Sequence, residues 1–117
     1  MIKIMQWQRT MHRLLKTKNM STLGIDYYNV KKGALILRAV NHKLRQQLIK
    51  LIDDEKRITV TEIYVRLRLE QSVASQHLAI LRKAGIVTTE REGKFIYYIV
   101  NYKRLEEVGK IVNDLVA

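Results

Sequence analysis

The sequence predicts a mainly α-helical fold with a small β-hairpin (α+β), and two stretches carry the prediction. Residues 71–84 place small and apolar residues at helical spacing and are closed by Gly85, which predicts a helix with one buried face: Ala74, Leu78, Leu81. Residues 86–100 turn at Gly93 and end in an aromatic, β-branched run that is typical of a strand. With a shorter helix predicted before residue 71, the order helix, turn, helix, hairpin is that of a winged helix-turn-helix.

The first segment, residues 1–20, is predicted to be a basic N-terminal arm or helix. It carries five cations and no acid, and its apolar residues recur at helical spacing: Ile4, Trp7, Met11, Leu14. Such an arm can pack on its own protein, on a partner or on a membrane surface, and we favour the first. Met20 is an alternative start of the chain.

Two helices are predicted next, after a linker at residues 21–26. The first covers residues 27–40 and is apolar around most of its circumference towards its end, which indicates burial from more than one side and hence a second subunit. Asn41 is expected to break or cap the chain. The following helix runs to about Asp53, with an inner stripe of leucine and isoleucine: Leu44, Leu48, Leu51, Ile52.

A short strand is predicted at residues 58–60, and Thr61 is expected to cap the helix that follows it. That helix offers three apolar residues to the core: Ile63, Leu67, Leu69. After the hairpin, a last helix at about residues 103–116 carries one apolar stripe: Leu105, Val108, Ile111, Val112, Leu115. We therefore expect a five-helix winged-helix domain over residues 27–117.

The composition limits the classes of function. The 117 residues suit one domain, and 22 Lys and Arg against 11 Asp and Glu give a net charge of +11, which favours polyanionic partners, most often nucleic acid. The chain has no cysteine, so disulfides and thiolate metal ligands are excluded. No apolar run approaches the roughly 20 residues of a membrane span, and no secretory signal is apparent, so a cytoplasmic location is expected.

The outer side of the helix at residues 71–84 is narrow, polar and nearly free of acid, which suits the DNA major groove. Gln76 is expected to read sequence because an amide can pair bidentately with adenine. Gln71, Ser72 and Ser75 are expected to assist at the helix start, two of them on phosphates. Three cations are further candidate DNA-binding residues: Lys83, Arg91, Lys94. The alternative for Lys83 is a solvated charge at the end of the helix.

Residues 40–100 resemble the ArsR/SmtB family of small bacterial winged-helix repressors. Five segments are similar to family motifs in order and spacing: residues 41–49 ("HPLR" then "IL"), 58–67 (strand and first helix), 71–78 ("QSxVSxHL"), 81–87 ("LRxAGLV") and 91–98 ("RxGRxxYY"). The resemblance implies sequence-specific binding of a pseudo-palindromic double-stranded DNA operator by a homodimer, and transcriptional repression. It also implies that the helices at about 27–41 and 103–116 form the dimer.

The family's usual metal sites have no counterpart here. Thr59 and Thr61 stand where the family's "CVC" cysteines would align, and residues 103–117 contain no histidine. We therefore expect no metal site and no cofactor.

His77 has two open interpretations. The resemblance implies a phosphate contact from the edge of the recognition helix, which we place slightly ahead. The alternative is a half-buried histidine that hydrogen-bonds within its own fold.

Other functions are less well supported. No nucleophile elbow, phosphate-binding glycine loop or pair of catalytic carboxylates is present, so we do not expect an enzyme. The main alternative to a DNA-binding regulator is a winged-helix protein-interaction module that binds an acidic partner. A membrane-surface protein held by residues 1–20 is a weaker alternative, and no membrane partner is expected.

Overall fold

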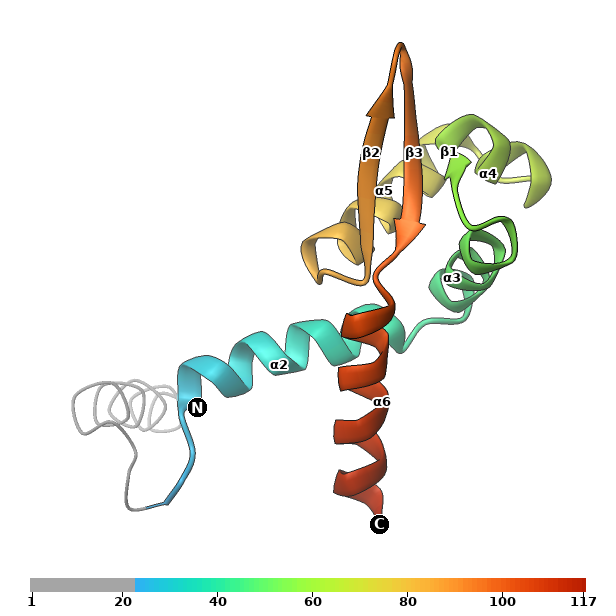
Figure 1. The fold of residues 1–117 in the computed structure, drawn as a ribbon. Helices are drawn as coiled ribbons and strands as arrows, with labels where there is room; N and C mark the ends of the chain where they lie inside the picture. The colour runs from blue at the N-terminus through green and yellow to red at the C-terminus, as the bar shows by residue number, and fades with distance from the viewer. Residues whose placement is uncertain (1–22) are drawn as a thin grey trace, which may run out of the picture. The chain divides into compact units, whose positions relative to one another are not determined.

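The computed structural model describes residues 23–117, so the arm predicted over residues 1–20 lies outside the described residues. The chain forms two compact units, residues 1–35 and 36–117, which are described separately. The described part contains five helices and a three-stranded antiparallel sheet (Figure 1), in the order α2 (Tyr27–Val40), α3 (Lys43–Glu55), β1 (Ile58–Thr59), α4 (Val60–Arg66), α5 (Gln71–Lys83), β2 (Val87–Glu92), β3 (Phe95–Val100) and α6 (Tyr102–Val116). The predicted α+β class and winged helix-turn-helix are confirmed.

Helix α2 has the predicted bounds, and it begins in the first unit. Asp26 starts it, because its Oδ1 accepts from the backbone N–H groups of Tyr28 (2.9 Å) and Asn29 (3.4 Å). Large apolar side chains along the helix are about half exposed: Tyr28, Val30, Leu35. Its last turn belongs to the second unit, where Ala39 is buried.

Helix α3 begins after an extended His42, which caps it: the Leu44 N–H donates to His42 Nδ1 at 3.1 Å. The cap is therefore His42 and not Asn41, whose backbone N–H still bonds the end of α2 at Leu37. The inner face of α3 buries Leu48 and Ile52 completely, as its apolar stripe predicted.

The first helix of the helix-turn-helix is capped two residues earlier than predicted. Thr59, and not Thr61, caps α4, because Thr59 is extended while Val60 is already helical. The Thr59 Oγ1 accepts from the Glu62 N–H (3.3 Å) and donates to the Glu62 carboxylate (3.1 Å), so one open backbone donor of the first turn is satisfied and the Glu62 side chain is held against the cap. Thr61 lies exposed within that turn.

Helix α5 ends where glycine was expected to close it. Gly85 has φ +77°, a left-handed conformation that glycine adopts without the steric cost of a Cβ. Asn101 joins this turn to α6: its Nδ2 donates to the Gly85 carbonyl at 2.9 Å, while its Oδ1 accepts from the Arg104 N–H at the start of α6.

Strands β2 and β3 form the hairpin, and β1 pairs with the other edge of β3, so the sheet order is β1-β3-β2. The register pairs Val87 with Val100 and Glu92 with Phe95, and Gly93 (φ +62°) makes the turn between them. Pairing of β1 with β3 holds the hairpin to the helix-turn-helix, because β1 runs directly into α4.

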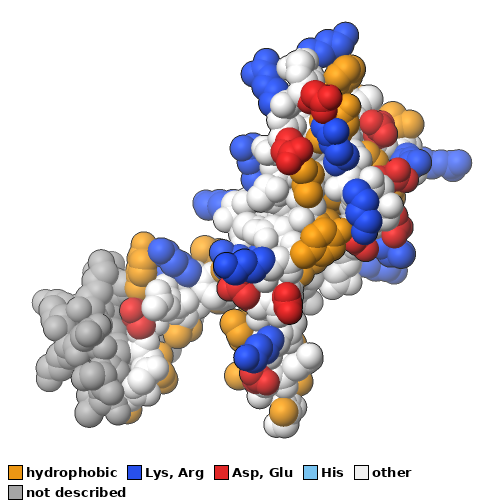
Figure 2. All heavy atoms as spheres, viewed as in Figure 1, with side chains coloured by type: hydrophobic (Ala, Val, Ile, Leu, Met, Phe, Trp, Pro, Cys, Tyr) orange, Lys and Arg blue, Asp and Glu red, His pale blue; other side chains and the backbone are white. Residues whose placement is uncertain are grey.

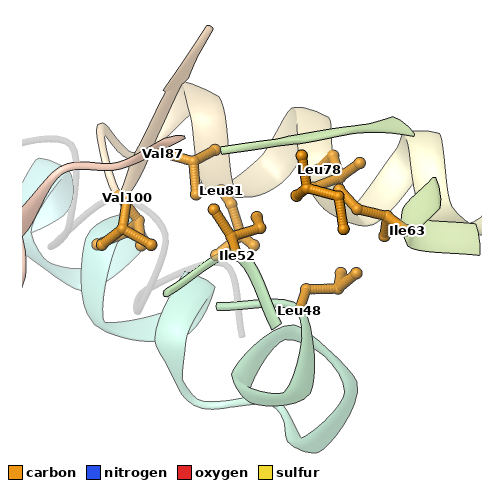
Figure 3. Close-up of a cluster of buried hydrophobic side chains, with 9 residues drawn as sticks. Leu48, Ile52, Ile63, Leu78, Leu81, Val87 and Val100 are labelled. Carbon is orange, nitrogen blue, oxygen red and sulfur yellow. The ribbon is translucent and has the colours of Figure 1, made fainter. Parts of the chain in front are cut away.

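The core lies where α3, α4, α5 and the base of the hairpin meet (Figure 3). Its fully buried side chains are Leu48, Ile52, Ile58, Ile63, Leu78, Leu81, Ile86 and Val87. The predicted inner face of α5 is confirmed, since Ala74, Leu78 and Leu81 have no exposed surface. Helix α6 contacts the core through Leu105 and Val108.

Helix α6 exposes large apolar side chains in its C-terminal half. Leu115 and Val116 are each 75 % exposed and Ile111 is 58 % exposed. Within residues 23–117, no helix combines the length and the apolar character that crossing a membrane requires.

Candidate nucleic-acid interface

The outer face of α5, which we define as Gln71, Ser72, Ser75, Gln76, Ala79 and Lys83, is exposed throughout. Its direction is fixed because the opposite side of the same helix is locked into the core by Leu78 and Leu81. The helix contains no acidic residue. Sequence reasoning passed over Glu70, which lies exposed just before the helix and makes no capping hydrogen bond with its side chain. The face is therefore polar and weakly basic, with one carboxylate at its entrance.

The two cations expected at the hairpin are both exposed at its tip, where Figure 2 shows Lys or Arg side chains. Arg91 donates from Nε to the Gly93 carbonyl at 3.2 Å, so its own turn orients its guanidinium. The Lys94 ammonium lies 5.4 Å from the centre of the Phe95 ring. Both positive charges remain available to an anionic ligand.

The hairpin is also braced at one side by Arg57, a residue that sequence reasoning missed. Its guanidinium pairs with the Glu92 carboxylate and lies 3.9 Å from the centre of the Tyr97 ring. This pairing raises the pKa of Arg57. Because Arg57 directly precedes β1, the contact holds the tip-side end of β2 against the body of the protein.

Arg45 of α3 is a second missed residue, and it is only 7 % exposed. It donates from Nε to the Ala39 carbonyl (2.7 Å) and from Nη2 to the Arg38 carbonyl (3.1 Å), which are otherwise unpaired at the end of α2. Its Nη1 lies 3.1 Å from His77 Nδ1. Its spacing could have indicated burial, since Arg45, Leu48 and Ile52 share one face of α3.

His77 is half-buried and takes the second of the two expected environments, a hydrogen bond within its own fold. A guanidinium can only donate, so His77 Nδ1 accepts and the neutral ring carries its proton on Nε2. The His42 ring lies alongside, with centroids 4.8 Å apart. A phosphate contact by His77 stays a prediction.

We expect His77 to make stability depend on pH. Burial, followed by the charges of His42 and Arg45, lowers the pKa of His77. The unfolded chain then binds more protons than the folded chain below pH about 6.5, so stability is lost as the pH falls through that value towards the depressed pKa. Between pH 7.5 and 6.0, where Asp and Glu do not titrate, the thermal unfolding midpoint of His77→Gln should fall less steeply with decreasing pH than that of wild type. Parallel pH curves would contradict this role.

Metal binding finds no support among the described residues. No three His, Asp or Glu side chains within residues 23–117 are placed to hold one ion. His42 and His77 each already use Nδ1 as an acceptor. Absence of a metal site nevertheless stays a prediction for the whole chain.

These elements define a class of protein. Strand β1, helices α4 and α5 and the β2–β3 hairpin form a winged helix-turn-helix that presents an exposed polar helix face beside a basic hairpin tip. Residues 42–89 match the family described as "Bacterial regulatory protein, arsR family". The chain belongs to this family of transcriptional regulators.

Individual relatives agree with this assignment. The chain is 31 % identical over 91 residues to the transcriptional repressor PagR of Bacillus anthracis, covering 78 % of this chain and 91 % of PagR. It is also 31 % identical over 87 residues to the transcriptional activator HlyU of Vibrio cholerae, covering 74 % and 80 % of the two chains. The crystal structure of PagR superimposes with a TM-score of 0.60 at 30 % identity, over 74 % of this chain and 98 % of PagR. These relatives are regulators and not enzymes, which confirms that prediction.

Proposed function

We propose that this protein binds a specific double-stranded DNA operator as a homodimer and represses transcription. The observation that carries the proposal is the outer face of α5: exposed, free of acid and fixed in direction by the core. Two such helices, one from each subunit, would enter successive major grooves about 34 Å apart on a pseudo-palindromic site. Repression is proposed by analogy with the repressor PagR, whereas HlyU is an activator.

Each candidate residue has a proposed role. Gln76 reads a base edge from the middle of the outer face. Gln71, Ser72 and Ser75 assist at the start of the helix, two of them by binding phosphates. At the tip of the hairpin, Arg91 and Lys94 bind phosphates beside the groove. Lys83 adds charge at the other end of α5, and His77 contacts a phosphate from the helix edge.

The homodimer is proposed from uncovered apolar surface on the flanking helices. On α6, three large apolar residues near the C-terminus are exposed: Ile111, Leu115, Val116. Hydrophobic side chains along this helix are visible in Figure 2. Helix α2 exposes Tyr28, Val30 and Leu35. A second copy of the chain would remove both surfaces from water, so residues 27–117 would act as one winged-helix domain with dimerisation helices at its two ends.

A pair of substitutions separates base reading from phosphate binding. Gln76→Ala should cost roughly 1–3 kcal/mol of binding free energy on the operator and far less on random duplex, because it removes a base contact. Lys94→Ala should weaken binding to both duplexes alike and reduce the slope of log Kobs against log salt by about one unit. Fluorescence anisotropy titrations at several salt concentrations measure both quantities.

Each outcome has a defined reading. Equal losses on operator and random duplex for Gln76→Ala would refute its role as a base reader. Failure of the wild-type chain to bind any duplex at about physiological salt would contradict DNA binding itself and favour an acidic protein partner.

A further inference from the structure

Helix α4 ends, at the turn before α5, in a backbone conformation that favours glycine. The Arg68 N–H donates to the Val65 carbonyl (3.3 Å), and the Leu69 N–H donates to the Tyr64 carbonyl (2.9 Å). This pair of bonds forms a Schellman motif, whose residue after the helix cap adopts a left-handed conformation. In this chain that residue is Arg68, with φ +54°.

An arginine in this position is strained by its own Cβ, which crowds the adjacent carbonyl. Glycine would satisfy the same two backbone hydrogen bonds without that strain. The backbone therefore gives no reason for arginine, and a strained residue at such a point indicates that its side chain has a use.

The Arg68 side chain is free to take an external ligand. It is exposed, and it makes no hydrogen bond or ion pair with any other described residue. Arg66, two residues earlier, is by contrast paired with Glu55, and Arg57 is paired with Glu92. Arg68 also lies three residues before Gln71, beside the start of α5 and the exposed Glu70. A cation here offsets that carboxylate where the helix would meet a duplex.

We propose that Arg68 binds a backbone phosphate of duplex DNA next to the point where α5 enters the groove. This inference rests on the proposed function and adds a contact that the sequence motifs do not contain. A guanidinium can donate two parallel hydrogen bonds to a phosphate, which suits a fixed anchor at the turn. Such a contact strengthens binding to all sequences alike.

The test exploits opposite expected effects on stability and on binding. Arg68→Gly should raise the thermal unfolding midpoint by roughly 3–5 °C, because strain is relieved. The same variant should bind duplex DNA about five- to tenfold more weakly and lose about one unit of salt slope. Arg68→Lys keeps the charge and the strain, so it should retain the slope and gain no stability. Lys50→Ala, which removes an exposed cation from α3, is the control and should change neither quantity.

The outcomes separate this inference from the proposed function. If wild type binds duplex DNA and Arg68→Gly keeps the full salt slope, the phosphate contact is refuted while the proposed function stands. If wild type binds no duplex DNA, both fall. A smaller slope in Arg68→Gly, together with a higher unfolding midpoint, supports the contact, because lost folding cannot explain weaker binding by a more stable protein.

Discussion

Replacing Arg45 by methionine is expected to lower the free energy of unfolding by about 3 kcal/mol. Methionine keeps an unbranched stem of similar length, so the loss comes mainly from hydrogen bonds. Three acceptors lose their donor: the carbonyls of Arg38 and Ala39 at the end of α2, and His77 Nδ1. A buried acceptor left unpaired costs roughly 1–3 kcal/mol, and losses at one site do not simply add.

Urea denaturation measures this change, and Arg38→Met is the matched control. Arg38 is exposed, so the same substitution there should stay within about 0.5 kcal/mol of wild type. Equal effects of the two variants would show that Arg45 does not organise the junction of α2, α3 and α5. A further consequence is that Arg45→Met should reduce the pH dependence assigned to His77, since the positive charge facing the ring is gone.

Leu115→Glu is expected to convert the proposed dimer to a monomer and to weaken operator binding on the order of 100-fold. Leu115 is 75 % exposed in the single chain and lies on the apolar stripe of α6. In the proposed dimer this side chain is buried, and an ionised carboxylate in its place would be desolvated without a partner. Loss of the dimer makes binding to the second half-site a separate event instead of an intramolecular one.

Sedimentation equilibrium gives the oligomeric state, and anisotropy on the operator gives the affinity. Lys110→Glu places a carboxylate on the same helix, on the side away from Leu115 and Val116, and should leave the proposed dimer intact. A dimeric Leu115→Glu, or a wild-type chain that is monomeric while bound to its operator, would contradict the proposed interface.

Local patterns predicted most of the fold. Both bounds of α2 and the buried face of α5 followed from helical spacing, and the hairpin followed from strand residues around one glycine. The outer face of α5 could be predicted equally well, because on one amphipathic helix the buried side determines the exposed side. Each of these features is set by residues close together in the sequence.

Features that depend on distant segments were missed. Arg57 meets Glu92 across 35 positions, and Arg45 meets His77 across 32. An arginine at an inner position of α3 predicts nothing until the carbonyls at the end of α2 are known to face it. The two interpretations of His77 could not be separated from sequence for the same reason. The cap at Thr59 depended on a strand one residue shorter than its β-branched residues indicated.

Selection of bound duplexes from a random DNA library tests whether the outer face of α5 reads a DNA sequence. We expect enrichment of inverted half-sites whose centres lie about one helical turn apart, and a selection with Gln76→Ala that loses preference at one base pair in each half-site. A library that shows no enrichment after selection, or one enriched in motifs that Gln76→Ala selects equally well, would contradict the claim that the outer face of α5 reads DNA.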